Sequence, residues 1–458
     1  MQPRILSRSE HTLSRKQIDP DALRVLYRLR SSGFKGFLVG GGVRDLLLER
    51  KPKDFDIGTD ASPQQVKKLF RNCFIIGRRF RLCHVRFGQK VVEVATFRRK
   101  AEPEEGHTIV RRDNTFGTPE QDAFRRDFTI NALFYDIADF SIIDYTGGIA
   151  DLEAKRVRVI GDPDDRFRED PVRMMRAVAI ACRLGFAIDR EAQESMRAHR
   201  GEIVKSSHVR ILDEIYKILR QGSSRLSFEQ LHATGLLAYI FPEAHKALGS
   251  GDKGLLDTLS SLDAYRNATG SDAALSNAIL IAHLLPPLGI PLSTSLRGSR
   301  APKKPFVDEQ GPADFALDPE DVPEEVDIAT EIPISLPFAR RDIERLSLLA
   351  AVGSKLHRAD LSAHAERNLS LKPYFQEALL LAEIHGMDAA VVERWREVAR
   401  STEAETVVGD LDPDLPGEGS PVSEAHPRPR PPAAPDGPRR PVRRRARRRP
   451  GRPRGPAA

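Results

Sequence analysis

Short apolar runs separated by glycine and polar turns characterise residues 22–160. Residues 37–39 and 54–57 predict short strands, because each couples apolar positions to a turn residue. Residues 85–87 and 91–97 predict a hairpin around the intervening glycine. This part of the chain therefore reads as mixed α/β.

Helix signals also follow the pattern of polar and apolar positions. Ser62, followed by proline and by Gln65, predicts a helix start with a capping box. Between residues 170 and 239 the apolar period becomes helical, and the first helix is predicted to begin at Asp170 and to end near Gly185.

Beyond the first helices the period stays helical over residues 246–298 and 338–400. Residues 300–337 are rich in proline and acids and predict a long loop. After Ser401 the composition changes to Pro, Gly, Ala and Arg, which cannot bury enough apolar surface to offset chain entropy, so disorder is predicted there.

The predicted fold class is an α/β head with a mixed sheet, followed by an all-α neck and body and a disordered basic tail. The expected parts are a loose polar leader at 1–21, the head at 22–160, the helical neck at 161–245, the body at 246–402 and the tail at 403–458.

Composition narrows the class of protein. Hydrophobic residues make up 40% of the 458 positions, which is enough for a real core. Cys73, Cys83 and Cys182 lack the spacing of a metal site or a disulfide framework, which favours a reducing, cytoplasmic location. No apolar run approaches the roughly 18 residues of a transmembrane segment, and residues 1–21 lack the apolar core of a signal peptide.

Charge is concentrated at one end of the chain. Residues 426–458 hold 12 Arg and one acid, or +11, so with a net charge of +7 the remaining chain carries 7 − 11 = −4. Such a tail favours a polyanion partner, although it would also suit a solubility or targeting extension. The densest run of candidate RNA contacts comprises Arg443, Arg444, Arg445, Arg447, Arg448 and Arg449.

Two carboxylates carry the first candidate chemistry. Asp54 and Asp56 alternate on a predicted strand, so both would lie on one face. Paired hard oxygen ligands can hold Mg²⁺ together with substrate phosphates. An isolated pair of this kind is also typical of solvated acids on an edge strand.

A glycine turn precedes these carboxylates. Residues 38–45 (LVGGGVRD) predict strand, turn and helix start, and the backbone at Gly40 and Gly41 could approach a phosphate closely. Arg44 would add guanidinium donors. The turn could instead only let the helix pack tightly on the sheet. With Asp54 ten residues beyond Arg44, the pattern outlines a phosphoryl-transfer site.

At this point the chain resembles a known family. Residues 39–56 are similar to the head of the class II nucleotidyltransferases, which comprise the bacterial poly(A) polymerases and the CCA-adding enzymes of transfer RNA. Further motifs follow in the family's order at residues 116–120 (FGTPE), 125–132 (RRDFTINA) and 169–176 (EDPVRMMR). The resemblance covers residues 36–245 and implies a polymerase-beta-like head.

The resemblance implies roles for individual residues. Asp54 and Asp56 would hold two Mg²⁺ ions, and Asp127 would be the third catalytic acid. Arg126 and Asn131 would contact ribose or phosphate. The matching nucleotide-binding positions of the first motif are Gly40, Gly41 and Arg44. Glu93 could serve as a third carboxylate, as in distant polymerases, or pair with an arginine, and the second interpretation is preferred.

Asp170 and Arg173 match the family's base-reading pair. A carboxylate can accept from an exocyclic amino group while a guanidinium donates to the adjacent ring nitrogen. Adenine and cytosine both offer that edge, so the pair selects them without separating them. Asp170 could also serve as a helix cap. Arg176 belongs to the same motif, but Ala179 stands where relatives often carry another arginine.

The resemblance favours polyadenylation over CCA addition. Residues 71–85 are similar to the poly(A) polymerase version of this strand region, and an arginine-rich tail suits an enzyme that accepts many RNA 3′ ends. In the expected reaction an RNA 3′-hydroxyl attacks the α-phosphate of ATP, so that adenylate is added and pyrophosphate is released. Alternatives are a CCA-adding enzyme, a non-enzymatic RNA-binding module, or a DNA-binding protein resting on the tail alone. RNA-decay or RNA-chaperone proteins are candidate partners.

Overall fold

The computed structural model describes residues 2–77, 81–99, 116–251, 253–270, 275–290, 292 and 336–409, with side chains as far as Thr402. Most of the predicted loop at 300–337 and the arginines at 443–449 lie outside these residues. The described side chains belong to one compact unit, Met1–Ala404.

A mixed sheet organises the head. Within the described residues it has eight strands in the order β1-β8-β7-β2-β3-β6-β5-β4. Only β3 and β6 pair in parallel, whereas every other neighbouring pair is antiparallel. The strands are β1 (Arg4–Leu6), β2 (Gly36–Val39), β3 (Asp56–Thr59), β4 (Cys73–Ile76), β5 (Leu82–Phe87), β6 (Lys90–Thr96), β7 (Leu133–Asp136) and β8 (Ile142–Asp144).

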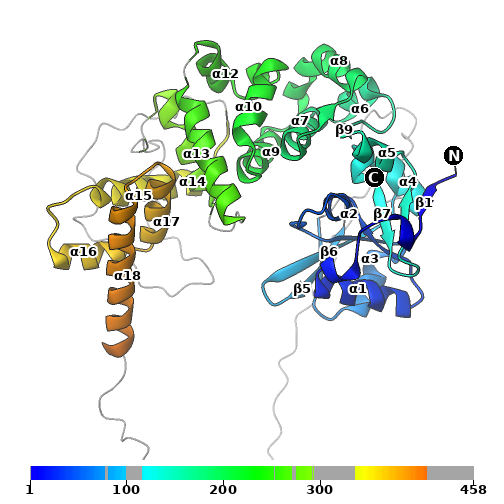
Figure 1. Cartoon of the computed structure of the whole chain (residues 1–458), viewed down its shortest axis with the longest axis horizontal. Coiled ribbons are helices and arrows are strands. Elements are labelled where there is room, and N and C mark those ends of the chain that lie inside the picture. Colours follow the sequence, from blue (N-terminus) through cyan, green and yellow to red (C-terminus); the bar gives the residue numbers. More distant parts are fainter. Residues whose placement is uncertain are drawn as a thin grey trace, which may run out of the picture. The chain divides into compact units, whose positions relative to one another are not determined.

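Helices α1 (Pro20–Ser31) and α3 (Pro63–Leu69) pack on one face of this sheet, beside β5 and β6 in Figure 1. Strand residues alternate accordingly, because successive side chains point to opposite faces. Val92 and Val94 are buried in this core, while Glu93 between them faces the other way. The burial of these apolar side chains is what holds α1 and α3 against the sheet.

The capping box predicted for α3 is confirmed. Ser62 Oγ accepts a hydrogen bond from the Gln65 backbone N–H at 3.4 Å, and Gln65 Oε1 accepts from the Ser62 N–H at 2.8 Å. The predicted hairpin is present as β5 and β6. Both signals are local, so neighbouring residues are sufficient to specify them.

The opposite face of the sheet is covered only in part by a second apolar cluster. It joins Phe37 and Val39 of β2 to Phe97, Phe134 and Ile160. Gly58 of β3 leaves room for this cluster, because a Cβ there would lie 2.5 Å from Phe97 Cε1. Close packing of Phe97 over the strand therefore requires glycine at this position.

The strand predicted at 54–57 begins later than expected. β3 starts at Asp56, whose Cα partner is Val39, the last residue of β2. The chain turns away at Gly40, so no backbone partner is left for Asp54. Asp54 therefore lies in the loop before β3 rather than on the strand.

The leader expected to be loose is ordered as well. β1 pairs with β8 at the edge of the sheet, and Leu13 and Ile18 are buried in the main core. These apolar residues are irregularly spaced, so no period in the sequence marks them. Strand pairing and burial with residues more than a hundred positions away provide the order.

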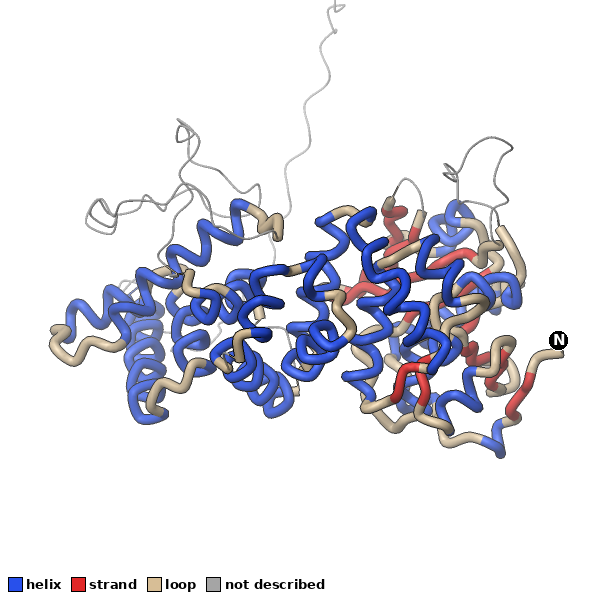
Figure 2. The backbone as a smooth tube through the Cα atoms, turned by 90° about the horizontal axis from the view of Figure 1, so that it is seen from above, coloured by secondary structure: helices blue, strands red, loops and turns tan. Residues whose placement is uncertain are grey.

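Beyond the head the described chain is helical, apart from a small parallel pair of β9 (Arg156–Val157) and β10 (Ala187–Ile188) (Figure 2). The head also contains the helices α2 (Gly41–Leu47), α4 (Pro119–Arg125) and α5 (Gly148–Glu153). The helices beyond the head are α6 (Pro163–Glu169), α7 (Val172–Leu184), α8 (Arg190–His199), α9 (His208–Arg220), α10 (Ser224–Ala233), α11 (Leu237–Ile240), α12 (Pro242–Gly249), α13 (Gly254–Thr269), α14 (Asn277–Leu284), α15 (Arg340–Leu356), α16 (Ala363–Ser370), α17 (Phe375–Ile384) and α18 (Ala389–Gly409).

The predicted ends of two helices can be compared directly. Gly185 caps α7 with φ +70°, as predicted, because a left-handed residue ends a helix most readily as glycine. At the other end, Asp170 caps the end of α6 instead of starting α7. α18 runs to Gly409, which is longer than the composition change at Ser401 predicts. None of the helices in the described ranges is long and apolar enough to cross a membrane.

A buried histidine makes the body sensitive to acid. His283 of α14 is fully buried beside His385, and desolvation lowers its pKa to about 4. Its ordinary pKa is about 6.5, so the unfolded chain binds more protons between these values. We expect the contribution of His283 to the free energy of unfolding to be greatest above pH ~6.5. The free energy of unfolding should then fall by up to about 3 kcal/mol as pH drops towards 4.

Urea unfolding followed at several pH values measures this loss. His283→Leu should flatten the pH dependence, whereas His357→Leu, at an exposed position on the same body, should leave it unchanged. Equal pH slopes in wild type and His283→Leu would contradict the assignment.

Candidate active site

The turn after β2 brings the backbone of the first motif next to an arginine. Gly40 adopts φ +75°, which favours glycine, and a Cβ there would lie 2.9 Å from Arg126 Nη1. Gly41 begins α2 directly afterwards. The sequence predicted close approach to a phosphate here, and the structure places a guanidinium at this turn.

Asp56 lies level with that turn because β3 pairs with β2. Its Cα partner Val39 immediately precedes Gly40, so the carboxylate and the glycine turn are neighbours. Asp54 and Asp56 are both exposed to solvent. The structure therefore brings together the glycine turn and both predicted metal-binding carboxylates.

A third carboxylate stands beside Asp56. β3 and β6 pair in parallel, and Ile57 lies opposite Val94. The residues that precede these two, Asp56 and Glu93, are therefore neighbours across the two strands. Desolvation and the charges of Glu93 and Asp54 together raise the pKa of Asp56 to about 6, against the opposing effect of Arg126. Glu93 Oε1 lies 3.5 Å from His84 Nε2, so the side chain that contacts Glu93 is a histidine and not the expected arginine.

These carboxylates fit a divalent cation. Asp54 and Asp56 supply exposed hard oxygens, and a bound cation would offset the desolvation and the carboxylate repulsion that raise the pKa of Asp56. In the part of the chain that the structure describes, no group of three or more His, Cys, Asp or Glu side chains is arranged as a metal site. A metal held here would therefore need further oxygens from substrate.

Asp127 is placed differently from the prediction. It is buried and forms an ion pair with Arg176 at 2.6 Å, and it accepts hydrogen bonds from the Phe128 N–H and from Asn131 Nδ2. Burial raises its pKa, but Arg176 and these hydrogen bonds outweigh that effect, so the pKa lies below its ordinary value. In the described structure Asp127 joins the head to α7.

Arg44 is likewise engaged inside the protein. It is 4% exposed, forms an ion pair with Asp45 at 2.7 Å and donates a hydrogen bond to Asn131 Oδ1. Asp45 also accepts from Arg183. Arg44 and Asn131 therefore hold α2 against the RRDFTINA segment, and the guanidinium is not presented to solvent as a phosphate ligand.

The two predicted base-reading residues lie near the start of α7. Asp170 Oδ2 accepts from Arg210 of α9 at 2.8 Å, while its Oδ1 is buried without a hydrogen-bond partner in the described structure. Arg173 donates to Glu169 Oε2 at 2.8 Å and to the Arg166 carbonyl at 2.9 Å. Each member of the pair therefore has a protein partner of opposite charge.

Arg166 is a junction residue that the sequence did not reveal. It is buried, and its guanidinium donates to Glu169 Oε2 at 2.6 Å and to the carbonyl of Arg125 at 2.8 Å. Arg126 accepts a further bond from Arg166 through its own carbonyl, while its side chain donates to Asp122. An arginine in a polar helix carries no sequence signal of such burial.

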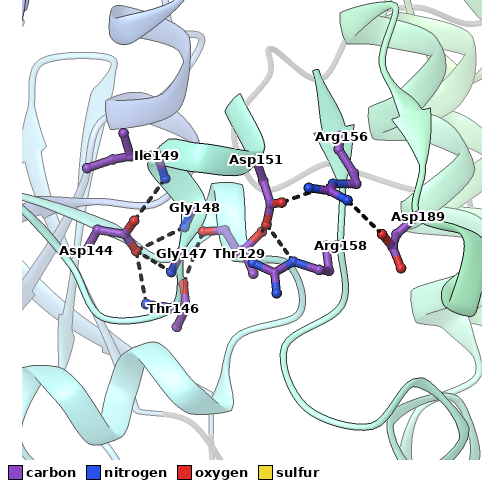
Figure 3. Close-up of polar contacts among 10 residues, drawn as sticks. All are labelled: Thr129, Asp144, Thr146, Gly147, Gly148, Ile149, Asp151, Arg156, Arg158 and Asp189. Atoms are coloured by element: carbon purple, nitrogen blue, oxygen red, sulfur yellow. Dashed lines mark hydrogen bonds and ion pairs between the residues drawn. The ribbon is translucent and has the colours of Figure 1, made fainter. Parts of the chain in front are cut away.

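A polar network fixes the RRDFTINA segment from behind (Figure 3). Asp151 is 1% exposed and accepts from Thr129 Oγ1 at 2.6 Å, from Arg158 Nε at 2.8 Å and from Arg156 Nε at 3.2 Å. Arg156 also reaches Asp189 beyond α7. Asp151 therefore links this motif to the segment that leads into the neck.

Asp144 shapes the turn that carries Asp151. Its carboxylate accepts four backbone hydrogen bonds, from the N–H groups of Thr146, Gly147, Gly148 and Ile149. A Cβ on Gly148 would lie 2.3 Å from the Thr129 carbonyl, so only glycine permits this contact (Figure 3). The sequence DYTGGIAD at 144–151 could have signalled this turn through its paired glycines and flanking acids.

The mixed sheet with its glycine turn and strand-borne carboxylates defines the head as a nucleotidyltransferase domain. Residues 36–158 match the family described as "Poly A polymerase head domain". Residues 185–248 match the family described as "Probable RNA and SrmB- binding site of polymerase A". The predicted class is thus confirmed for the head.

Individual relatives are similar over about half of the chain. Poly(A) polymerase I of Salmonella typhi is 47% identical over 247 residues, covering 52% of this chain and 53% of that protein. A CCA-adding enzyme of Bacillus velezensis is 36% identical over 219 residues, covering 47% of this chain and 54% of that protein. The chain therefore spans about half the length of the curated relatives it matches.

The fold extends further than this sequence similarity. A crystal structure of Bacillus stearothermophilus CCA-adding enzyme in complex with CTP superposes with a TM-score of 0.56 at 24% identity, covering 85% of this chain and 83% of that one. The predicted order of α/β head and helical neck and body is confirmed.

We expect Asp151→Ala to lower the free energy of unfolding by about 1–2 kcal/mol, because it leaves the buried Thr129 hydroxyl without its acceptor and breaks the hydrogen bond with the partly exposed Arg158. Chemical denaturation measures the loss. Glu153→Ala is the matched control, because Glu153 lies on the same helix with a side chain that is 66% exposed. Similar stabilities for the two variants would show that the network carries no net stabilisation.

Proposed function

We propose that this chain is a polynucleotide adenylyltransferase that adds adenylate to RNA 3′ ends from ATP and releases pyrophosphate. The observation that carries the proposal is the position of Asp56, level with the glycine turn and next to Asp54 and Glu93. The similarity to poly(A) polymerase I over about half of the chain, together with the family match at residues 36–158, supports the adenylate product.

Asp54 and Asp56 are the residues that would hold Mg²⁺. When bound there, Mg²⁺ would lower the pKa of the attacking 3′-hydroxyl and neutralise charge on the triphosphate. The turn at Gly40 and Gly41 allows the triphosphate to approach the backbone, and Arg126 supplies positive charge beside that turn. The exposure of both carboxylates leaves them accessible to substrate.

The remaining motif residues position these groups. Asp127, paired with Arg176, fixes the segment that carries Arg126 and Asn131. This assigns Asp127 a positioning role in place of the third catalytic acid that the resemblance implies. The carboxylate that adjoins Asp56 in the structure is Glu93.

Asp170 and Arg173 are proposed to read the base. The unpartnered Oδ1 of Asp170 offers an acceptor for an exocyclic amino group, and the hydrogen bond from Arg210 to Oδ2 orients this carboxylate. Glu169 orients Arg173 in the same way. An edge with an amino donor and a ring acceptor satisfies both groups, which includes adenine and cytosine and excludes guanine and uracil.

CCA addition is the second candidate function. It is favoured by the fold shared with the Bacillus stearothermophilus enzyme and by the similarity to the Bacillus velezensis one. Polyadenylation ranks first because the identity to poly(A) polymerase I is higher over a longer stretch. RNA contacts by the tail arginines remain part of the proposal for the whole chain.

Incubation of two RNAs, an oligoadenylate and an RNA with a transfer-RNA-like end, with labelled NTPs separates the two functions. Each labelled NTP is first supplied alone. We expect long ladders with ATP and no extension with GTP or UTP, because only the amino-bearing edge satisfies Asp170 and Arg173 together. One to three additions that need CTP and a transfer-RNA-like end would establish CCA addition instead. Absence of extension with every nucleotide and both RNAs would contradict the proposed class of reaction.

We expect Asp56→Asn to lower kcat for adenylate addition at least about a hundredfold, because losing a charged ligand costs several kcal/mol of transition-state stabilisation. Asp60→Asn is the control, since exposed Asp60 accepts a backbone hydrogen bond that asparagine can keep. Binding of labelled RNA is measured in parallel and should change less than twofold. Retention of more than roughly a tenth of the wild-type kcat would contradict the metal assignment.

A further inference from the structure

One row of side chains crosses four neighbouring strands on the partly uncovered face of the sheet. Asp56 of β3 lies beside Glu93 of β6, Glu93 is the register partner of His84 on β5, and His84 is the partner of Phe74 on β4. The row therefore leads from the candidate catalytic carboxylates to the edge of the sheet.

The outer end of this row is apolar and exposed. Phe74 is 53% exposed and Ile76 is 48% exposed, although their neighbours Cys73 and Ile75 turn towards the core. The guanidinium of Arg86 lies 5.7 Å from the centre of the Phe74 ring and is itself exposed. An exposed aromatic ring beside a cation is a combination that binds stacked bases and phosphates.

We propose that this face, defined by Phe74, Ile76, His84 and Arg86, binds the 3′-terminal nucleotides of the RNA that is extended. The inference deepens the proposed function and rests on it. Phe74 would stack a base, while Arg86 would contact a backbone phosphate. His84 pairs with Glu93 and so lines the path between Phe74 and the carboxylates.

The geometry of the reaction favours this side of the sheet. In phosphoryl transfer the attacking and leaving oxygens lie roughly in line on opposite sides of the phosphorus. The glycine turn assigned to the triphosphate follows β2, on one side of β3, whereas β6, β5 and β4 lie on the other side. The RNA hydroxyl must therefore approach Asp56 from the side where Glu93, His84 and Phe74 form the row.

The chemistry of the surface favours RNA over a protein strand as its occupant. β4 is an edge strand, and exposed apolar residues on an edge strand usually carry a risk of aggregation. Base stacking gives such residues a function that tolerates any sequence, which suits a substrate with varied ends. Arg86 adds the positive charge that complements a phosphate backbone.

The test compares Phe74→Ala and Phe74→Tyr with wild type. We expect Phe74→Ala to raise KM for oligoadenylate about tenfold, because one stacked base is lost. Phe74→Tyr keeps an aromatic ring and should have the KM of wild type. KM for ATP at saturating RNA should stay within twofold. Tyr27→Ala is the matched control, because Tyr27 is an exposed aromatic residue on α1, which packs on the other face of the sheet.

Arg86→Gln tests the same face independently, in case Phe74→Ala fails to fold. Arg86→Gln should reduce the slope of log KM for RNA against log salt by about 0.7, as expected for one phosphate contact on a single strand. Circular dichroism verifies the fold of each variant.

A binding readout separates this inference from the proposed function. An oligoadenylate ending in 4-thiouridine should crosslink to residues 73–87 of wild type under conditions without ATP. If wild type crosslinks there but extends no RNA, the inference holds and the proposed reaction fails. Crosslinks confined to other segments, an unchanged KM for RNA in Phe74→Ala, or a change in KM for ATP alone would overturn the inference.

Discussion

The pairing of β3 with its two neighbours is the constraint on which the site depends. Its antiparallel partner β2 ends at Val39, opposite Asp56, so the glycine turn and the carboxylate are neighbours by register. Its parallel partner β6 brings Glu93 beside the same carboxylate. A slip of one residue would turn Asp56 into the core and Ile57 out of it, because side chains alternate along a strand.

Apolar packing along β3 holds this register, although the register brings carboxylates near one another. Burial and the negative charges of Glu93 and Asp54 all disfavour the ionised form of Asp56, and their effect is visible in its raised pKa. On the same strand Gly58 admits the Phe97 ring, and Ile57 is fully buried on the opposite face. Apolar burial on both sides of β3 therefore stabilises a strand whose first residue is electrostatically unfavourable in the absence of a cation.

The connection between head and neck depends on buried charge pairs. The ion pair of Asp127 with Arg176 joins the RRDFTINA segment to α7, and the hydrogen bonds from Arg166 to the carbonyls of Arg125 and Arg126 join it to α6. Removal of one member would leave a buried charge unpaired, which is costly. The same residues flank the proposed base-reading pair, so the nucleotide site and the junction share their supports.

The sequence predicts local features of this fold well and long-range partners poorly. Ser62 with Gln65, and Gly185 at the end of α7, follow from neighbouring residues alone. By contrast, the exclusion of Asp54 from β3 depends on where β2 ends, and the partner of Asp127 lies 49 positions away. The motifs located Asp54, Asp56 and Asp127, but only the structure separates the exposed pair from the buried Asp127.

The central claim is that Asp54 and Asp56 form a cation site beside the nucleotide, and direct metal binding tests it most simply. Mn²⁺ binding can be followed by electron paramagnetic resonance in the presence of a non-hydrolysable ATP analogue. The account predicts binding by wild type and by Asp60→Asn, and loss of binding in Asp54→Asn and Asp56→Asn. Equal Mn²⁺ affinity in all four proteins would contradict it.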